Sequence, residues 1–309
     1  MSVAEKYSHL IKDKAKLLGF SDCGITSATL LIEERSRLLS WLSKHYHGDM
    51  SYMENHLDTR IDSRKLLNNA RSVILVLQNY YTPEKQKNIS APMVSKYAYG
   101  RDYHKIIRKK IGKLLEFIQN ELIPCNARIF VDSSPVMEKA LASRSGLGWI
   151  GKNSLLISRK YGSFFFIGGI IADIELTYDN TTKDYCGDCT RCMDACPTRA
   201  IIQPRIVDSR RCLSYLTIEF KGSTLPHQFK NKFQNRLFGC DICQDICPWN
   251  KNAPAHNEPE LKPNPEFLEM TKDEWYNLDE EKYNIIFKGS AVKRIKYEGL
   301  RRNLEFLRL

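Results

Sequence analysis

The sequence predicts an α+β fold: a large N-terminal α/β domain, a small cysteine-rich domain and a short helical tail. Strand and helix patterns alternate up to about residue 176, as in a layered domain. Eight of the ten cysteines then lie between residues 186 and 247, and the last residues read as a basic helix. Two polar linkers, at 177–185 and at the proline-containing stretch 251–267, separate these parts. The expected domains are 1–176, 177–255 and 256–309.

The elements of the first domain follow from its apolar periodicity. Residues 3–18 form an amphipathic helix that ends at Gly19, and 72–80 is apolar enough to be a central buried strand. Pro135 suits the first turn of a helix that Ser134 would cap and that would run to about Ser145. The other expected elements are strands at 22–26, 127–132, 152–158 and 164–172, and helices around 38–41 and at 103–121.

The charge balance and the absence of an export signal narrow the class of protein. The net charge is +11 and the sequence pI is near 9.1, which suits a partner that is a polyanion such as a nucleic acid. A merely soluble protein would show the same excess, because the basic residues are spread along the chain. The N-terminus has no apolar segment of a signal peptide, and the longest apolar run, 164–172, is too short to cross a bilayer. We therefore expect a cytosolic protein.

The cysteines are spaced as iron–sulfur ligands. Cys186, Cys189, Cys192 and Cys196 form the run C-x₂-C-x₂-C-x₃-C-P, in which three thiolates bind one cluster and the fourth binds a second cluster. A second run is incomplete, since Leu237 stands where its first cysteine would be. Its three cysteines and the remaining candidate ligand are Cys240, Cys243, Cys247 and Cys212.

Exchange of the fourth ligand between the two runs gives two 4Fe–4S sites. The first site would use Cys186, Cys189, Cys192 and Cys247, and the second Cys196, Cys212, Cys240 and Cys243. The alternative is a pair of zinc sites with four cysteines each, which the C-P endings disfavour. Cys23 and Cys125 lie in apolar segments and are expected to be inert buried thiols.

A glycine-rich turn at 146–153, GLGWIGKN, matches the G-x-G-x-x-G pattern of dinucleotide-binding enzymes. That pattern requires a strand before the glycines and a helix after them. Here a helix precedes the turn and a strand follows, so a nicotinamide site is disfavoured. Two interpretations remain: a tight structural turn, or glycines that let a large flat cofactor approach the backbone.

Four segments together resemble the epoxyqueuosine reductase family, with support from LGFSDCGIT near the N-terminus and the stretch that ends at Arg60. The segments are KYAYGRDYHK (96–105), VDSSPVMEKALASRSGLGWIGKNSLLI (131–157), CGDCTRCMDACPT (186–198) and GCDICQDICPWN (239–250). The resemblance implies a base-off cobalamin held between the N-terminal domain and a ferredoxin-like two-cluster domain. It also implies reduction of epoxyqueuosine to queuosine at the wobble position of tRNA.

The resemblance assigns roles to particular residues. Asp132 would protonate the alkoxide that forms when reduced cobalt attacks the epoxide, and burial beside the corrin is expected to raise its pKa. The block 97–104 would border the active site. The resemblance assigns no separate role to its residues Arg101, Asp102, Tyr103 and His104. Candidate cobalamin contacts are Arg60, Tyr97, Asp132, Gly151, Lys152, Asn153, Ser154, Ser214 and Asp241.

The expected partners are tRNA with epoxyqueuosine in its anticodon and an external one-electron donor of the flavodoxin or ferredoxin type. The chain is expected to act as a monomer away from membranes. Many family members continue into a helical-repeat domain, whereas this sequence stops at Leu309. The tRNA would then contact the first two domains and the tail, whose basic residues are Lys293, Arg294, Lys296, Arg301 and Arg302.

Two other functions fit parts of the sequence. A cobalamin and iron–sulfur reductase could act on another substrate, such as an organohalide, although those enzymes usually carry export signals. A non-enzymatic electron carrier or an RNA-binding module with structural metal would leave the first 175 residues without a role.

Overall fold

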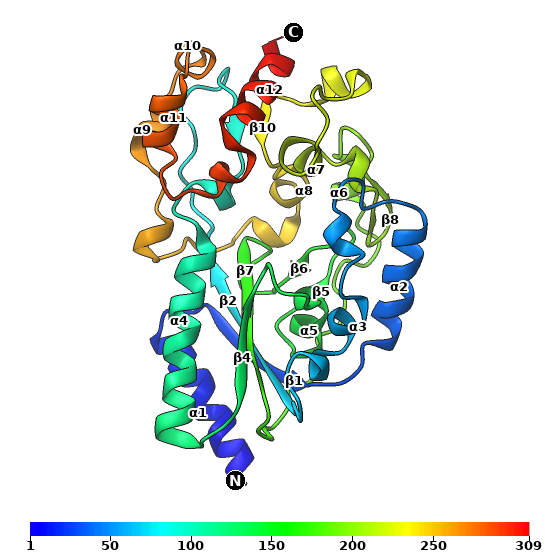
Figure 1. Ribbon diagram of the computed structural model, residues 1–309, viewed down its shortest axis with the longest axis vertical. Helices are drawn as coiled ribbons and strands as arrows, with labels where there is room; N and C mark the ends of the chain where they lie inside the picture. Colours follow the sequence, from blue (N-terminus) through cyan, green and yellow to red (C-terminus); the bar gives the residue numbers. More distant parts are fainter. Residues whose placement is uncertain (309) are drawn as a thin grey trace.

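A four-stranded sheet forms the centre of the N-terminal part in this computed structural model, which describes residues 1–308 (Figure 1). The strand order is β1 (Asp22–Ser27), β2 (Ser72–Asn79), β7 (Phe165–Ala172) and β4 (Ala127–Val131). All three pairings are antiparallel. The α+β class agrees with this arrangement, but the α/β description of the first domain is wrong.

Helices cover both faces of the sheet. Its strands are therefore apolar on both sides, a pattern that is more common in parallel sheets. On one face, Ile74 and Val76 pack with α1 (Val3–Leu17) and α4 (Tyr103–Phe117). On the other face, Val73, Leu75 and Leu77 pack with α5 (Glu138–Arg144). Every residue of β2 is buried, as its prediction as a central strand requires.

Two local predictions in the first domain are wrong. The helix α5 begins at Glu138 and is not capped by Ser134, because residues 133–136 form tight turns in which Ser133 N bonds to Val131 O. The strand predicted at 152–158 is reduced to β6 (Leu156–Ile157), which pairs with β5 (Trp149–Ile150) in a hairpin. The other helices of this part are α2 (Ile32–Ser43) and α3 (Leu57–Ile61), and a single π-helical turn, Ile118–Leu122, extends α4.

The cysteine-rich segment consists of short elements at one end of the sheet (Figure 1). Its helices are α6 (Arg191–Asp194), α7 (Leu213–Ile218) and α8 (Ile242–Asp245). Its strands are β8 (Ile201–Gln203), β9 (Ile206–Val207) and β10 (Arg236–Phe238). Strand β10 pairs in parallel with β3 (Met93–Val94), so the segment is joined by backbone hydrogen bonds to the N-terminal part.

The C-terminal residues build a core of their own around Trp275. The helices are α9 (Pro265–Glu269), α10 (Lys272–Tyr276), α11 (Glu280–Ile286) and α12 (Lys296–Arg308). Val94 and Tyr99 from the N-terminal part and Phe238 from β10 belong to the same core. None of the helices among residues 1–308 is both long and apolar enough to span a membrane.

The basic tail differs from its prediction. The sequence predicts a basic helix here, but Arg294 lies in a 3-10 segment, and Lys296 has a positive φ of 56° that separates this segment from α12. Arg302 is also not a solvated side chain, since it donates to the carbonyls of Phe220 (2.8 Å) and Gly222 (3.0 Å). Leu309 lies outside the described residues.

Arg302 should therefore contribute to stability more than Arg301 does. Arg302→Ala leaves two carbonyls beyond α7 without their donor and should lower the free energy of unfolding by about 1–3 kcal/mol. Arg301→Ala removes one bond, to Tyr276 O, and a long contact to Glu305, and should cost about 1 kcal/mol or less. Urea unfolding of both variants measures the difference, and equal losses would contradict this account.

Candidate functional site

Asp132 lies where the end of β4 meets the start of α4. Its Oδ2 accepts hydrogen bonds from Tyr103 OH and His104 Nε2, both at 2.9 Å. The other ring nitrogen of His104 lies 2.7 Å from Asp102 Oδ1, and Asp102 also caps the N-terminus of α4. The ring of Tyr103 is stacked on Phe166, with centroids 3.9 Å apart. The sequence block 97–104 thus supplies a rigid support for the Asp132 carboxylate.

His104 is held between two carboxylates and carries a proton at neutral pH. The hydrogen bond with Asp102 and then that with Asp132 raise the pKa of His104 to about 9, against a smaller effect of burial. Burial raises the pKa of Asp132, but the hydrogen bonds from His104 and Tyr103 outweigh it and leave this pKa below its ordinary value. In the protein alone these donors lower the pKa of Asp132, whereas the rise predicted from the sequence concerns burial beside a corrin and stays a prediction. The ionised form is stabilised by its two donors, and the side chain is 53% exposed.

The loop that carries Asp132 is strained. Asp132 has a φ of 50°, in the left-handed region that residues other than glycine adopt infrequently. Its N–H donates to Glu138 Oε1 at 2.6 Å, which ties the loop to the first turn of α5. Burial, followed by the charge of Asp132, raises the pKa of Glu138 to about 8. Sequence reasoning did not select Glu138, although it lies six residues beyond Asp132 in the matched segment.

Arg294 and Tyr52 approach the same carboxylate from other parts of the chain. Arg294 lies close enough to lower the pKa of Asp132, and its guanidinium pairs with Glu219 at 2.7 Å. Arg60 donates to the backbone oxygen of Tyr52 at 3.1 Å. The structure therefore brings the tail residue Arg294 toward Asp132.

The glycine turn is a structural element of the β5–β6 hairpin. Gly146 has a φ of 74° and ends α5, and a Cβ on Gly148 would lie 2.1 Å from Ile157 O in β6. Helix α5 precedes the turn and a hairpin follows it, so the order required for a dinucleotide site is absent from the described turn. The Cβ of an alanine at Gly151 would meet Ile157 and Asn153.

Residues 152–154 lie between the sheet and the cysteine-rich segment. Asn153 is buried and donates to Cys243 O at 3.3 Å. Lys152 O accepts from Arg205 N at 2.9 Å. Ser154 has a φ of 62°, and its buried hydroxyl has no hydrogen-bond partner among residues 1–308.

The four cysteines of the first predicted site, Cys186, Cys189, Cys192 and Cys247, are neighbours in the structure. Burial, followed by the neighbouring thiolates of Cys247, Cys186 and Cys189, raises the pKa of Cys192 to about 11. Trp149 Nε1 lies 3.4 Å from Cys186 Sγ, and Trp149 packs with Cys247.

The other four cysteines form a second group. Burial, and then the neighbouring Cys212 and Cys240, raise the pKa of Cys243, and Cys196 is a charged neighbour of Cys212. The two groups adjoin, because Cys192 is also a neighbour of Cys243. No three His, Cys, Asp or Glu side chains among residues 1–308 converge on the position of a single metal ion.

Asp241 connects the second group to the N-terminal part. It is buried, and its Oδ2 accepts from Lys96 N at 2.8 Å. Lys96 Nζ in turn pairs with Asp245 at 2.7 Å. Asp241 is therefore positioned by the segment that contains Tyr97, whose ring lies next to Tyr103 with centroids 6.4 Å apart.

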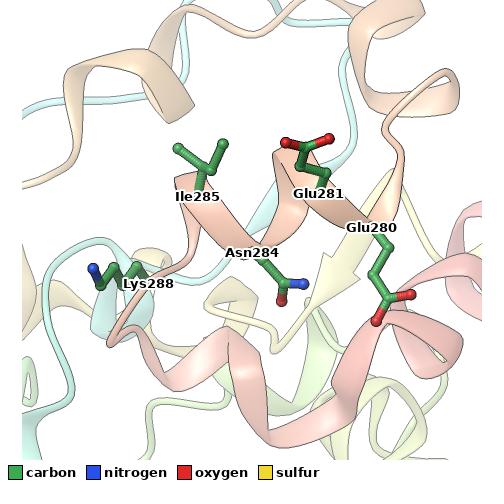
Figure 2. A pocket seen from close by; sticks show the side chains of 5 residues that line it. All are labelled: Glu280, Glu281, Asn284, Ile285 and Lys288. Carbon is green, nitrogen blue, oxygen red and sulfur yellow. The ribbon is translucent and has the colours of Figure 1, made fainter.

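Two further features lie outside this arrangement. The backbone N–H of Ser214, a predicted cobalamin contact, donates to Cys212 Sγ. Figure 2 shows a depression on α11, and none of its lining residues belongs to the predicted site. They are Glu280, Glu281, Asn284, Ile285 and Lys288.

Comparisons with known proteins agree with this geometry. A family model described as "4Fe-4S double cluster binding domain" matches residues 185–250, and one described as "Epoxyqueuosine reductase QueG, DUF1730" matches residues 60–133. The epoxyqueuosine reductase of Cellulophaga algicola is 50% identical over 308 residues, which covers 100% of both chains. The chain belongs to the epoxyqueuosine reductase family.

Solved epoxyqueuosine reductases have the same fold. A crystal structure with a tRNA-Tyr epoxyqueuosine-modified stem loop has a TM-score of 0.87 at 28% identity, covering 98% of this chain and 80% of that chain. The Bacillus subtilis epoxyqueuosine reductase, solved with its catalytic aspartate loop swung out of the active site, has a TM-score of 0.85 at 28% identity. That match covers 98% of this chain and 81% of the B. subtilis chain.

A B12-dependent reductive dehalogenase shares the fold at a lower level. Its TM-score is 0.52 at 15% identity, and the match covers 97% of this chain and 38% of the dehalogenase. This likeness concerns the fold alone. The organohalide alternative therefore has weaker support than the epoxyqueuosine reductase family.

The charge state of His104 can be tested directly. We expect NMR titration of the cofactor-free chain to give His104 a pKa of about 9, and Asp102→Asn to lower it toward the ordinary value near 6.5. Because the folded pKa is the higher one, the stability contributed by protonated His104 is present below about pH 6.5 and is lost as the pH rises through about 9. A His104 pKa that is the same in both proteins would contradict the two-carboxylate arrangement.

Proposed function

We propose that this chain reduces the epoxide of epoxyqueuosine in tRNA and so forms queuosine. The observation that carries the proposal is the 50% identity to a named epoxyqueuosine reductase over the full length of both chains. The related structure bound to a modified tRNA stem loop and the basic charge of this chain support an RNA substrate. Asp132 and its hydrogen-bonded donors supply the acid chemistry that an epoxide requires.

The two groups of cysteines would hold two 4Fe–4S clusters within a domain of residues 177–255. Cys186, Cys189, Cys192 and Cys247 would bind the first cluster, and Cys196, Cys212, Cys240 and Cys243 the second. The match of the double-cluster family model to residues 185–250 supports this assignment. The adjoining positions of Cys192 and Cys243 would let electrons pass from one cluster to the other.

A cobalamin between the domain of residues 1–176 and the cluster domain fits the polar atoms left without partners. The buried Arg60 Nε, Ser95 Oγ and Ser154 Oγ have no hydrogen-bond partner among residues 1–308. The amide side chains and phosphate of a corrinoid are suitable partners for such groups. Of the predicted contacts, Arg60 and Ser154 are supported in this way, while Asn153 and Asp241 already have protein partners. When bound, the cobalamin would supply a strongly reducing metal centre.

The protein's own residues would manage the protons. Opening of the epoxide and loss of water consume two electrons and two protons. Asp132 is ionised at rest, so we assign the stored proton to His104, which is protonated at neutral pH and 2.9 Å away. Proton transfer from His104 Nε2 to Asp132 Oδ2 would let Asp132 act as the acid toward the alkoxide. Asp102 would keep the ring of His104 in the orientation that this transfer requires.

The proposed function is tested with anaerobically reconstituted protein and tRNA that contains epoxyqueuosine. Asp132→Asn should retain cobalamin and iron but lose about 10²–10⁴-fold in turnover, because the amide cannot relay a proton. Ser133→Ala changes the neighbouring residue and serves as the control for the loop. Turnover near that of the unmodified protein in a cofactor-loaded Asp132→Asn variant would remove Asp132 from the mechanism.

Paired cysteine replacements test the assignment of ligands. The unmodified chain should contain about eight irons and eight sulfides, and Cys186→Ser/Cys247→Ser should keep about four irons, since both ligands belong to one cluster. Cys186→Ser/Cys240→Ser should damage both clusters and keep less iron. Cys125→Ser is the control and should keep about eight. Equal iron in the two double variants, or zinc with little sulfide, would contradict the assignment.

A further inference from the structure

A basic pocket lies next to the first group of cysteines. It is lined by Arg159, Lys160, Pro248, Trp249 and Asn252. Both Arg159 and Lys160 are exposed, and the lining contains no acidic side chain. Neither the epoxide chemistry nor the proposed cobalamin contacts use these residues.

Aromatic side chains connect the pocket to the cysteines. Trp249 lies two residues after Cys247, and its ring is 5.0 Å from that of Trp149. Trp149 contacts Cys186 Sγ through its ring nitrogen at 3.4 Å. Cys189 of the same group is exposed to solvent. A molecule seated in the pocket would therefore be separated from the first group by little more than one layer of side chains.

The rim of the pocket combines aromatic and positive groups. Tyr185 precedes Cys186, its ring is 5.8 Å from Trp249, and Arg159 lies over it at 5.0 Å. Asp22 is the acidic group that faces Lys160, and it is partly buried. Tyr185 is exposed and Trp249 is partly exposed, and such aromatic rings beside arginine and lysine are typical of a protein-binding surface that selects an acidic partner.

The two groups of cysteines differ in what surrounds them. The second group adjoins Asp241, which is a charged neighbour of Tyr97 near Asp132. The first group adjoins the pocket and includes the exposed Cys189. Electrons that travel toward the site of Asp132 would therefore arrive at the first group and leave from the second.

We propose that the surface formed by Arg159, Lys160, Tyr185 and Trp249 docks an acidic one-electron carrier protein. The carrier loses one electron, the first cluster gains it, and no bond forms or breaks. Two such transfers supply the two electrons that one epoxide requires. This inference rests on the proposed function, because it assumes that the first group of cysteines holds a redox cluster.

An RNA phosphate is the other anionic partner that a basic pocket could bind. The position of the pocket favours the carrier, since the pocket adjoins the first cysteine group and none of its residues is among the charges that act on Asp132. A reducing partner benefits from closeness to the cluster, whereas a tRNA must reach Asp132.

The experiment compares Arg159→Glu/Lys160→Glu with a matched control, Lys109→Glu/Lys113→Glu, which reverses two exposed charges on α4. The probe is a purified acidic flavodoxin. Its binding to the reconstituted protein is measured by calorimetry at several salt concentrations, and its electron transfer to the clusters by stopped-flow absorbance. The pocket variant should bind at least about tenfold more weakly at low salt, with a shallower salt dependence. The control variant should bind as the unmodified protein does.

Reduction of the clusters by dithionite and the affinity for tRNA should be the same in all three proteins. Unchanged flavodoxin binding in the pocket variant, or a loss confined to tRNA binding, would overturn the proposal, and the second result would assign the pocket to RNA. The proposed function is separable, because binding and cluster reduction need no tRNA. A protein that is inactive on epoxyqueuosine but keeps a salt-sensitive flavodoxin site would refute the proposed function alone.

Discussion

The buried carboxylate of Asp241 sets the relation between the cysteine-rich segment and the rest of the molecule. It accepts from Lys96 N, while the adjacent strand β10 pairs with β3. A buried charge is tolerated only with such partners, so this contact fixes the position of the segment closely. The same stretch, residues 96–104, ends with Tyr103 and His104, which both donate hydrogen bonds to Asp132. One short stretch of chain thereby joins the second group of cysteines to the acid group of the site.

The features that the sequence predicted correctly depend on local patterns. The buried strand β2 and the helix α1 follow from apolar periodicity, with Gly19 after the helix. The assignment of the cysteines to two clusters rests on another local pattern, their spacing, and stays a prediction. Asp132 was selected by its resemblance to a family segment, and the structure places it among polar partners.

The features that the sequence did not reveal depend on contacts between distant residues. The antiparallel order could not be inferred, because β2 pairs with β7, whose partner residues are up to 100 positions away, and both strands are covered by helices. The role of His104 requires its approach to a residue 28 positions later. Arg294 lies before Lys296, whose positive φ interrupts the expected helix. Local sequence periodicity does not contain these long-range contacts.

The lowered pKa of Asp132 changes how the acid chemistry is understood. A carboxyl group that kept its proton through burial alone would have no such partners, whereas Asp132 accepts from two donors that favour its ionised form. A carboxylate beside a protonated histidine can instead be recharged after each turnover, since a histidine with a pKa of about 9 takes up a proton again at neutral pH. Electrons would then arrive through the cysteine-rich segment and protons through the N-terminus of α4. In the proposed function, the electron route and the proton route would thus be formed by different segments of the chain.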